Sequence, residues 1–294
     1  MENMSLKLPK EISHCTVVAS VSGGKDSTAM ILALRESGIE ARHVFADTKW
    51  EAPETYEYID TLRSKLGITI DVVCSDGMPE KVRKRAVFPA RMQRWCTGEL
   101  KINPLRKYHD AIEATGVETV SVMGIRADES VSRSKMSEVQ DDDEWGGWVW
   151  RPLLKWSIED TISIHHRHGI PLNPLYLRGH DRVGCYPCIF SRKSEIDLIA
   201  KHAPWRIDEI RELERETTAT RAERNAVEPE RYKYEHSTFF QTRDPREPHM
   251  GIDRIVEWAG TTRGGKQLPL LVEPPQGGCM RWGICEAPPE GTNP

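Results

Sequence analysis

A six-residue segment, Ser22-Gly23-Gly24-Lys25-Asp26-Ser27, constrains the fold of this chain more than any other feature. It lies between an apolar run, Thr16–Val21, and a stretch of helical spacing that begins at Thr28. A strand, a glycine turn and a helix in this order direct backbone N–H groups and the positive end of the helix dipole to one point. Gly23 and Gly24 let a ligand approach the backbone closely, because they carry no Cβ atom. The segment therefore predicts a phosphate-binding loop.

The side chains of this loop indicate which phosphate ligand it takes. Lys25 adds a mobile positive charge, and Ser22 and Ser27 add hydroxyl donors. Asp26 would repel a phosphate unless a hard cation such as Mg²⁺ lies between the two. The loop therefore predicts a metal-bridged polyphosphate. It is not a Walker A loop, which needs four residues between its glycines and a Gly-Lys-Ser/Thr ending.

Apolar runs and helical spacing alternate along the chain. The predicted strands are Thr16–Val21, 41–46, 68–73, 119–123 and 148–156, and the first predicted helices are 28–37, 51–66 and 157–168. This alternation predicts an α/β fold with a doubly wound, mainly parallel five-stranded sheet and helices on both faces. Ligands of such sheets bind at the carboxyl ends of the strands. Asp47 and Arg126 follow two of the strands there, so we expect both to lie near the nucleotide.

Length and composition set the domain organisation. The 294 residues, 38% hydrophobic and 29% charged, are typical of a soluble globular protein with a sizeable core. No run approaches the ~18 apolar residues of a membrane span, and the N-terminus lacks a signal-peptide core, so we expect a cytoplasmic protein. We predict a nucleotide-binding domain over 1–192 and a C-terminal helical and irregular appendage over 193–294, packed on the core, with charged helices in 195–224. We expect the acidic cluster 141–144 to be a solvated loop tip.

Basic residues gather between two of the predicted elements. The net charge of −4 makes no general case for nucleic-acid binding. The cluster consists of Lys81, Arg83, Lys84, Arg85, Arg91 and Arg94. It fits a solvated helix face and a surface that collects an anionic substrate equally well, and its spacing reads no base.

The chain has seven cysteines and no signal peptide, which favours a reducing compartment and metal or redox chemistry over disulfides. Cys185 and Cys188 form a Cys-x-x-Cys pair in a turn that is rich in glycine and proline, a spacing that suits one metal centre. Further candidate ligands are Cys96, Cys279 and Cys285. We expect Cys15 and Cys74 to act as small apolar residues.

The loop resembles the Ser-Gly-Gly-x-Asp-Ser loop of the PP-loop ATP pyrophosphatases, which split ATP between its α and β phosphates. Other motifs occur in the order found in the phosphoadenosine phosphosulfate (PAPS) reductase family, over roughly residues 15–192. They are Arg94-Trp95-Cys96-Thr97, Lys101, Pro104-Leu105, Gly124-Ile125-Arg126, Asn173-Pro174-Leu175-Tyr176 and Gly184-Cys185-x-x-Cys188. The chain is therefore identified as a member of this family, which belongs to the PP-loop (adenine nucleotide alpha hydrolase-like) superfamily.

The resemblance implies a cofactor. Iron–sulfur members of the family hold a [4Fe–4S] cluster with a Cys-Cys pair and a Cys-x-x-Cys pair. Here Trp95-Cys96 replaces the first pair, so Cys96, Cys185 and Cys188 would leave one position open. Cys285 is the first candidate for the fourth ligand and Cys279 the second. Three cysteines alone would leave an open iron, as in sulfur-transferring PP-loop enzymes. Structural zinc, or no metal, remains an alternative.

Two departures argue against a reductase. The PAPS reductases carry an altered loop, whereas this chain keeps the full ATP-type loop, and it lacks their C-terminal Glu-Cys-Gly-Leu-His motif. The prediction is an ATP α,β-pyrophosphatase that uses Mg²⁺ to adenylate an acceptor for sulfur transfer. Lys25, Asp26 and Arg126 would be catalytic, with Arg126 reaching the α-phosphate. The alternatives are a PAPS or adenylyl-sulfate reductase, and a nucleotide-binding subunit of a nucleic-acid sulfur-modification complex. The sulfur donor, the small-molecule or nucleic-acid acceptor, and assembly as a homodimer or within a complex stay open.

Overall fold

The computed structural model describes residues 5–143, 145–229, 232, 236–240 and 251–261. Its centre is a six-stranded sheet with the strand order β3-β2-β1-β4-β6-β5. The strands are β1 (Thr16–Val21), β2 (Arg42–Asp47), β3 (Ile70–Cys74), β4 (Thr119–Val122), β5 (Val139–Asp142) and β6 (Gly147–Trp150). Five of them run parallel, and β5 pairs antiparallel with β6. The fold is therefore the mainly parallel α/β sheet that the sequence predicts.

Ten α-helices occur in the described part of the chain. They are α1 (Lys25–Glu36), α2 (Pro53–Leu66), α3 (Met78–Arg85), α4 (Trp95–Thr97), α5 (Asn103–Glu113), α6 (Ile158–Arg167), α7 (Pro174–Leu177), α8 (Lys193–His202), α9 (Pro204–Val227) and α10 (Ile252–Ala259). A π-helical turn, η2 (Gly98–Ile102), joins α4 to α5. Short 3-10 turns are η1 (Lys10–Ile12), η3 (Ala127–Glu129) and η4 (Arg133–Lys135).

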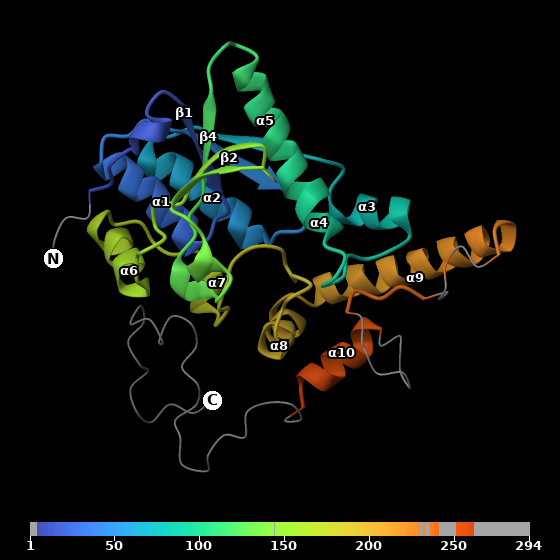
Figure 1. The fold of residues 1–294 in the computed structure, drawn as a ribbon. Helices are drawn as coiled ribbons and strands as arrows, with labels where there is room; N and C mark the ends of the chain where they lie inside the picture. Colours follow the sequence, from blue (N-terminus) through green and yellow to red (C-terminus); the bar gives the residue numbers. More distant parts are fainter. Residues whose placement is uncertain (1–4, 144, 230–231, 233–235, 241–250, 262–294) are drawn as a thin grey trace, which may run out of the picture.

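The helices cover both faces of the sheet. Val17 and Ala19 of β1 face one way and pack in a core with α1, α2 and α6. Val18 faces the other way and packs with Leu105 and Ile112 of α5. Successive side chains of a strand point to opposite faces, so a strand buried on both sides is apolar throughout. Figure 1 shows α5 across the sheet from α1 and α6. This doubly wound arrangement leaves the carboxyl ends of β1, β2 and β4 open to a ligand.

The sheet has one more strand than the sequence predicts. The five predicted strands are the five parallel ones, and the missed strand, β5, contains Asp141 and Asp142. The expectation of a loop tip is wrong for these two residues. Acidic residues are depleted in strands, but an antiparallel edge strand leaves side chains in solvent, and Asp141 is exposed. Another difference concerns α1, which begins at Lys25 rather than at Thr28.

A second core lies beside the sheet. It combines Met78 and Val82 of α3, Leu100 of η2 and Tyr186 with the apolar faces of α8, α9 and α10. The helices after residue 192 therefore share a core with segments that precede it. The division at residue 192 stays a prediction.

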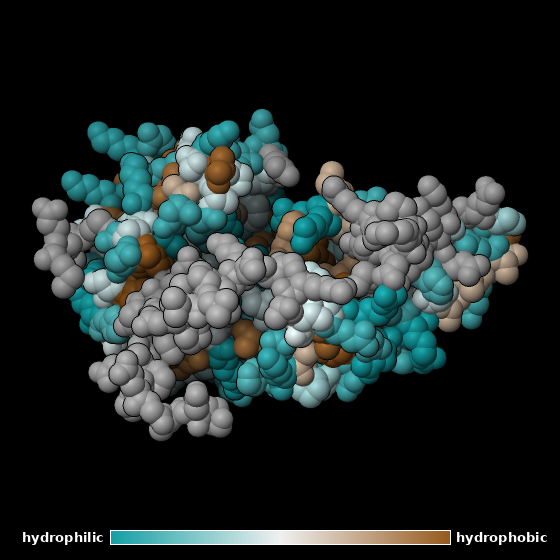
Figure 2. Space-filling view, turned by 90° about the horizontal axis from the view of Figure 1, so that it is seen from below, coloured by the Kyte–Doolittle hydropathy of each residue, from teal (hydrophilic) through white to brown (hydrophobic). Residues whose placement is uncertain are grey.

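Hydrophilic side chains cover much of the face drawn in Figure 2, and apolar side chains appear there in smaller patches. None of the described helices is long and apolar enough to cross a bilayer.

Candidate functional site

The predicted phosphate loop borders a cavity of roughly 660 Å³. The loop leaves β1 at Val21 and enters α1 at Lys25. The loop residues that line the cavity are Ser22, Gly24, Lys25, Asp26 and Ser27. The Ser27 hydroxyl donates to the Gly24 carbonyl oxygen at 3.0 Å and accepts from the Ser22 backbone N–H at 3.2 Å. These bonds hold the turn in one conformation before any ligand arrives.

Asp26 lies between two cations. Lys25 Nζ donates to its Oδ2 at 2.6 Å, and Arg126 Nε donates to its Oδ1 at 2.6 Å. Burial raises the pKa of Asp26, but Lys25 and Arg126 outweigh burial and leave that pKa below its usual value. Asp26 is therefore a carboxylate at neutral pH. It offers the oxygen ligands that Mg²⁺ prefers.

Arg126 and Asp47 both contact other side chains at the carboxyl edge of the sheet. Arg126 is only 4% exposed, also donates to Asp128 at 2.6 Å, and does not line the cavity in the described part of the chain. It therefore supports Asp26 from behind. Asp47 accepts from the backbone N–H of Lys49 at 2.7 Å and from the Tyr56 hydroxyl at 2.8 Å. It too is absent from the described cavity lining.

Buried groups outside the loop support its backbone. His165 Nε2 lies 2.9 Å from the Lys25 carbonyl oxygen, and the Lys25 N–H donates to the Tyr176 hydroxyl at 3.2 Å. Asn173 is fully buried and donates to the Gly23 carbonyl oxygen at 3.1 Å. The sequence marked Asn173 and Tyr176 as part of a family motif without giving them a role, and it gave no signal for His165.

Glycine is required at two positions of this assembly. Gly23 has φ 71°, and a Cβ atom there would lie 2.8 Å from Thr55 Cγ2. Gly124, just after β4, packs on α1, and a Cβ atom there would lie 2.6 Å from the Asp26 carbonyl oxygen. Because that neighbour is backbone, it cannot rotate away. Gly124 therefore sets the distance between β4 and the loop.

The Cys-x-x-Cys turn is held by the segment that follows β2. The backbone N–H of Tyr186 donates to the Trp50 carbonyl oxygen at 2.7 Å, and Trp50 Nε1 donates to the Pro187 carbonyl oxygen at 3.0 Å. Cys185 also forms an isolated bridge with Glu51. These contacts fix the turn on the carboxyl edge of the sheet. Burial, followed by the charges of Glu51 and Cys188, raises the pKa of Cys185 despite a lowering effect of Lys101.

Cys96 joins this turn from the helical run that leads into α5. Burial, then the charges of Cys185 and Cys188, raises the pKa of Cys96, so the three thiols are close enough to influence one another. The charge of Cys185 is the largest cause that raises the pKa of Lys101. An ammonium group beside the thiols stabilises thiolates, the form that binds a metal. Cys279 and Cys285, the candidates for the fourth ligand, lie outside the described residues.

The spacing of the thiols tests which metal fits. Four sulfurs about 2.3 Å from one tetrahedral zinc lie about 3.8 Å apart. Among the described residues, one group has three ligand atoms all within 4.8 Å of one another, and it consists of His14, Cys15 and Glu118. Cys96, Cys185 and Cys188 are therefore spaced more widely than in a formed zinc site. The three thiols are soft donors of the kind that both zinc and iron–sulfur clusters take.

Cys15 and Cys74 lie in different environments. Cys15 is 8% exposed, as expected for a small apolar residue. The same expectation is wrong for Cys74, which is exposed at the end of β3. β3 is an edge strand of the sheet, so less of the protein covers its end.

One buried residue near the cysteines gave no signal in the sequence. His180 is 3% exposed, and its Nε2 has no hydrogen-bond partner within the described ranges. It lines a small cavity together with Cys185 and Cys188. Burial lowers the pKa of His180 to about 4, so the ring is neutral at pH 7.

The basic stretch divides into two groups, one that fits a solvated helix face and one that fits an anion-collecting surface. The cations of α3 pair with carboxylates of the chain itself: Lys81 with Glu99 at 3.1 Å and Lys84 with Asp76 at 2.8 Å. Arg91 and Arg94 instead lie over the ring of Phe190, with guanidinium carbons 5.7 and 5.2 Å from its centroid. The first group is a solvated helix face, and Arg91 of the second group belongs to a cavity wall.

One segment, residues 182–195, connects the phosphate loop to the cysteines. Arg182 and Glu195 line both the cavity at the predicted phosphate loop, the candidate nucleotide cavity, and the small cavity at Cys185 and Cys188. The protein therefore has a phosphate loop and a thiol cluster on two sides of one wall.

Comparison with known proteins agrees with this architecture. The model of the phosphoadenosine phosphosulfate reductase domain matches residues 16–191, more than half of the chain. The protein therefore belongs to the PAPS reductase domain family of the PP-loop superfamily, a family of enzymes.

Individual relatives span different parts of the chain. An uncharacterised 37.8 kDa protein of Escherichia phage 186 is 32% identical over 86% of this chain and 91% of its own length. The adenosine 5'-phosphosulfate reductase of Anoxybacillus flavithermus is 28% identical over 60% of this chain and 74% of its own. A solved phosphoadenylyl-sulfate reductase of Candida auris, in a phosphate complex, is 14% identical, with a TM-score of 0.47 over 60% of this chain and 84% of its own.

Proposed function

We propose that this protein is an ATP α,β-pyrophosphatase that adenylates an acceptor and prepares it for sulfur transfer. The observation that carries the proposal is the complete phosphate loop, with Lys25 and Asp26 on a cavity that shares a wall with Cys185 and Cys188. An altered loop would suffice for a substrate that is already adenylated, whereas ATP cleavage needs a site for the pyrophosphate leaving group.

The reaction balances without an oxidant or a reductant. An acceptor oxygen attacks the α-phosphorus of ATP, the bond from this phosphorus to the bridging oxygen breaks, and pyrophosphate leaves with the electron pair. A hydrosulfide ion then attacks the acceptor carbon that carries the adenylate, the C–O bond breaks, and AMP leaves with its electron pair. Each step is a displacement.

The loop residues would act in the first step. Lys25 and the loop N–H groups would stabilise the charge that develops on pyrophosphate. Mg²⁺ would arrive with ATP, and Asp26 and Glu129 both line the cavity and offer carboxylate oxygens to it. Arg126 would act through Asp26, by keeping it ionised and in place, rather than by touching the α-phosphate. A contact between Asp47 and the nucleotide stays a prediction.

The cysteines would hold an iron–sulfur cluster, with Cys285 as the predicted fourth ligand. With three thiolates alone, the cluster would supply an open site for sulfide beside the nucleotide cavity. With Cys285 as a fourth ligand it would supply none, and sulfide would come from solution. In the chain itself, Lys101 would stabilise the thiolate of Cys185, and the Trp50 contacts would keep the turn on the sheet edge.

The test measures pyrophosphate release from ATP and Mg²⁺ with hydrosulfide and a panel of small carboxylates, RNA and DNA. Lys25→Ala should weaken ATP binding about 30-fold, because it removes a charge-assisted contact with phosphate. Lys155→Ala is the matched control, since Lys155 is 83% exposed. If neither ATP binding nor pyrophosphate release occurs, and Lys25→Ala changes nothing, the proposal fails.

A reductase is the second candidate, favoured by the adenosine 5'-phosphosulfate reductase relatives. It predicts sulfite release from adenylyl sulfate with a thiol reductant, and loss of that release in Cys285→Ser. ATP binding without any turnover would instead favour a nucleotide-binding subunit of a nucleic-acid sulfur-modification complex.

A further inference from the structure

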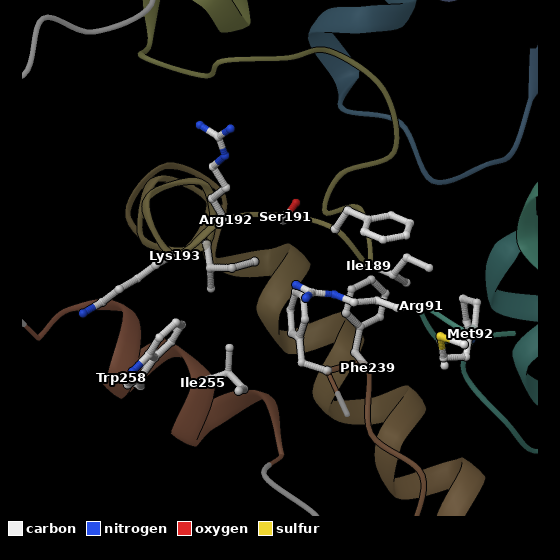
Figure 3. Close-up of a pocket in the computed structure, with 14 residues that line it drawn as sticks. Arg91, Met92, Ile189, Ser191, Arg192, Lys193, Phe239, Ile255 and Trp258 are labelled. Atoms are coloured by element: carbon white, nitrogen blue, oxygen red, sulfur yellow. The ribbon is translucent and has the colours of Figure 1, made fainter. Parts of the chain in front are cut away.

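A second large cavity, of roughly 840 Å³, is lined in part by the residues that follow the cysteine turn. Figure 3 shows its lining: the loop at Arg91 and Met92, the segment from Ile189 to Lys193, Phe239, and Ile255 and Trp258 of α10. Much of the lining is apolar or aromatic. The proposed chemistry of ATP cleavage does not use this cavity.

The charged groups of the cavity all have one sign. The described lining contains Arg91, Arg192 and Lys193 and no carboxylate. Arg192 pairs with Asp181 at 3.4 Å, whereas the described ion pairs leave Arg91 without an acidic partner, and its guanidinium lies over Phe190. Lys193 lies over the ring of Trp258, 5.0 Å from its centroid. An apolar floor with cations around it fits a ligand with a flat apolar body and a negative charge.

The position of this cavity connects it to both halves of the candidate site. Phe190 and Arg192 line this cavity and the nucleotide cavity. Ser191 lines this cavity and the cysteine cavity, and it exchanges hydrogen bonds with Cys188 at 2.8 and 3.0 Å. Figure 3 shows the Arg192 side chain extending away from Ile255 and Trp258. A ligand seated here adjoins the nucleotide on one side and the thiols on another.

We propose that this second cavity binds the acceptor, and that the acceptor is an organic anion with a flat apolar body. The inference rests on the proposed adenylation, because it names the substrate class of that reaction. The binding itself can be tested without turnover. A nucleic acid would instead need a track of cations along its backbone. The four cations of the basic stretch on α3 are paired with the protein's own carboxylates, which leaves Arg91 and Arg94.

The experiment compares two fluorescent probes on the full chain. 8-Anilinonaphthalene-1-sulfonate carries the negative charge, and N-phenyl-1-naphthylamine has the same rings without it. The anionic probe should bind about tenfold more tightly, and Arg91→Gln should reduce that ratio about threefold. Arg215→Gln, on the exposed face of α9, is the matched control and should change neither. Trp258→Ala should weaken both probes about fivefold, because it removes a shared apolar wall.

Nucleotide competition shows which cavity the probe occupies. A non-hydrolysable ATP analogue should leave the anionic probe bound, and Lys25→Ala should bind this probe as the unaltered chain does. Three results would overturn the proposal. They are displacement of the probe by the analogue, equal affinity of the chain for both probes, and unchanged probe binding in Arg91→Gln and Trp258→Ala. Failure of pyrophosphate release alone would overturn the proposed reaction and leave this binding result intact. Tighter binding of single-stranded DNA than of the anionic probe, with the same dependence on Arg91, would replace the small anion by a nucleic acid.

Discussion

The phosphate loop and the cysteine turn are built in different ways. The loop is six consecutive residues between a strand and a helix, and buried groups such as Asn173 and His165 support it. The cysteine cluster draws Cys96 from a helical run and Cys185 from a turn, and its thiols have pKa values raised by burial. The loop is therefore formed before its ligand binds. In the cysteine cluster, burial favours the protonated thiols of Cys96 and Cys185, so the proposed metal would have to displace their protons.

Loss of a charge in the loop should lower the stability of the folded protein, and Asp26→Asn has the largest expected effect. Removing the carboxylate leaves Lys25 and Arg126 facing each other in a mostly buried place, which should cost about 3 kcal/mol in the free energy of unfolding at pH 7. The folded pKa of Asp26 is lowered from 3.8. The stabilisation that the Asp26 carboxylate gives to the folded protein is therefore present above the ordinary pKa of 3.8, and it is lost as the pH falls through the lower folded pKa.

Urea unfolding at several pH values measures this effect. The difference between Asp26→Asn and the unaltered chain should shrink below about pH 4. Asp60→Asn is the control, since Asp60 is 70% exposed in an i,i+3 pair with Arg63, and it should change stability by no more than about 0.5 kcal/mol. A constant difference across the pH range would show that charge is not the cause.

Alanine substitutions of two glycines compare how tightly the phosphate loop and the cysteine turn are packed. In Gly124→Ala the new Cβ atom meets the Asp26 carbonyl oxygen at 2.6 Å, whereas Gly184, next to Cys185, has no atom within 4 Å of such a Cβ. Gly124→Ala should cost about 2 kcal/mol and weaken ATP binding, because the loop must shift. Gly184→Ala should stay within about 0.5 kcal/mol. Calorimetric ATP titration and urea unfolding measure both, and similar losses in the two variants would contradict the comparison.

The sequence predicted local features well because they need no tertiary contact. A strand, a glycine turn and a helix specify the loop in consecutive residues, and β1 begins and ends where the apolar run does. The other four parallel strands were also visible as apolar or aromatic runs, although β3 is largely exposed and β6 ends at Trp150, well before residue 156. β5 was missed because an exposed edge strand with two aspartates has neither the period nor the composition of a buried one.

Contacts between distant segments could not be predicted in this way. Nothing in the sequence placed His165 against the loop, Arg126 behind Asp26, or Trp50 against the cysteine turn. The division of the basic stretch into cations paired with carboxylates and arginines over an aromatic ring also depends on where Phe190 lies. These relations follow from packing between elements, and local residue patterns carry no record of it.

Thiol alkylation at pH 8, mapped by mass spectrometry, examines the cysteine region directly. In metal-free protein, exposed Cys74 should react at least about tenfold faster than Cys96 and Cys185, because burial raises the pKa of these two thiols and leaves little thiolate. Reconstitution with iron and sulfide should protect Cys96, Cys185 and Cys188 and leave Cys74 reactive. Whichever of Cys279 and Cys285 becomes protected is the fourth ligand. Unchanged reactivity of Cys185 after reconstitution would contradict the proposed cluster.

Lys101→Met has the smallest expected effect, and it isolates the role of charge in the cysteine region. Burial raises the pKa of Cys185, and Lys101 partly offsets this rise. Removal of the Lys101 charge should therefore raise the pKa of Cys185 further. The Cys185 thiolate fraction at pH 8, and with it the alkylation rate in metal-free protein, should fall about threefold. Lys107→Met, at an exposed position of α5, is the matched control. If Lys101→Met leaves the Cys185 rate unchanged while Cys74 reacts as before, the thiolate of Cys185 does not depend on this ammonium group, and burial alone sets its reactivity.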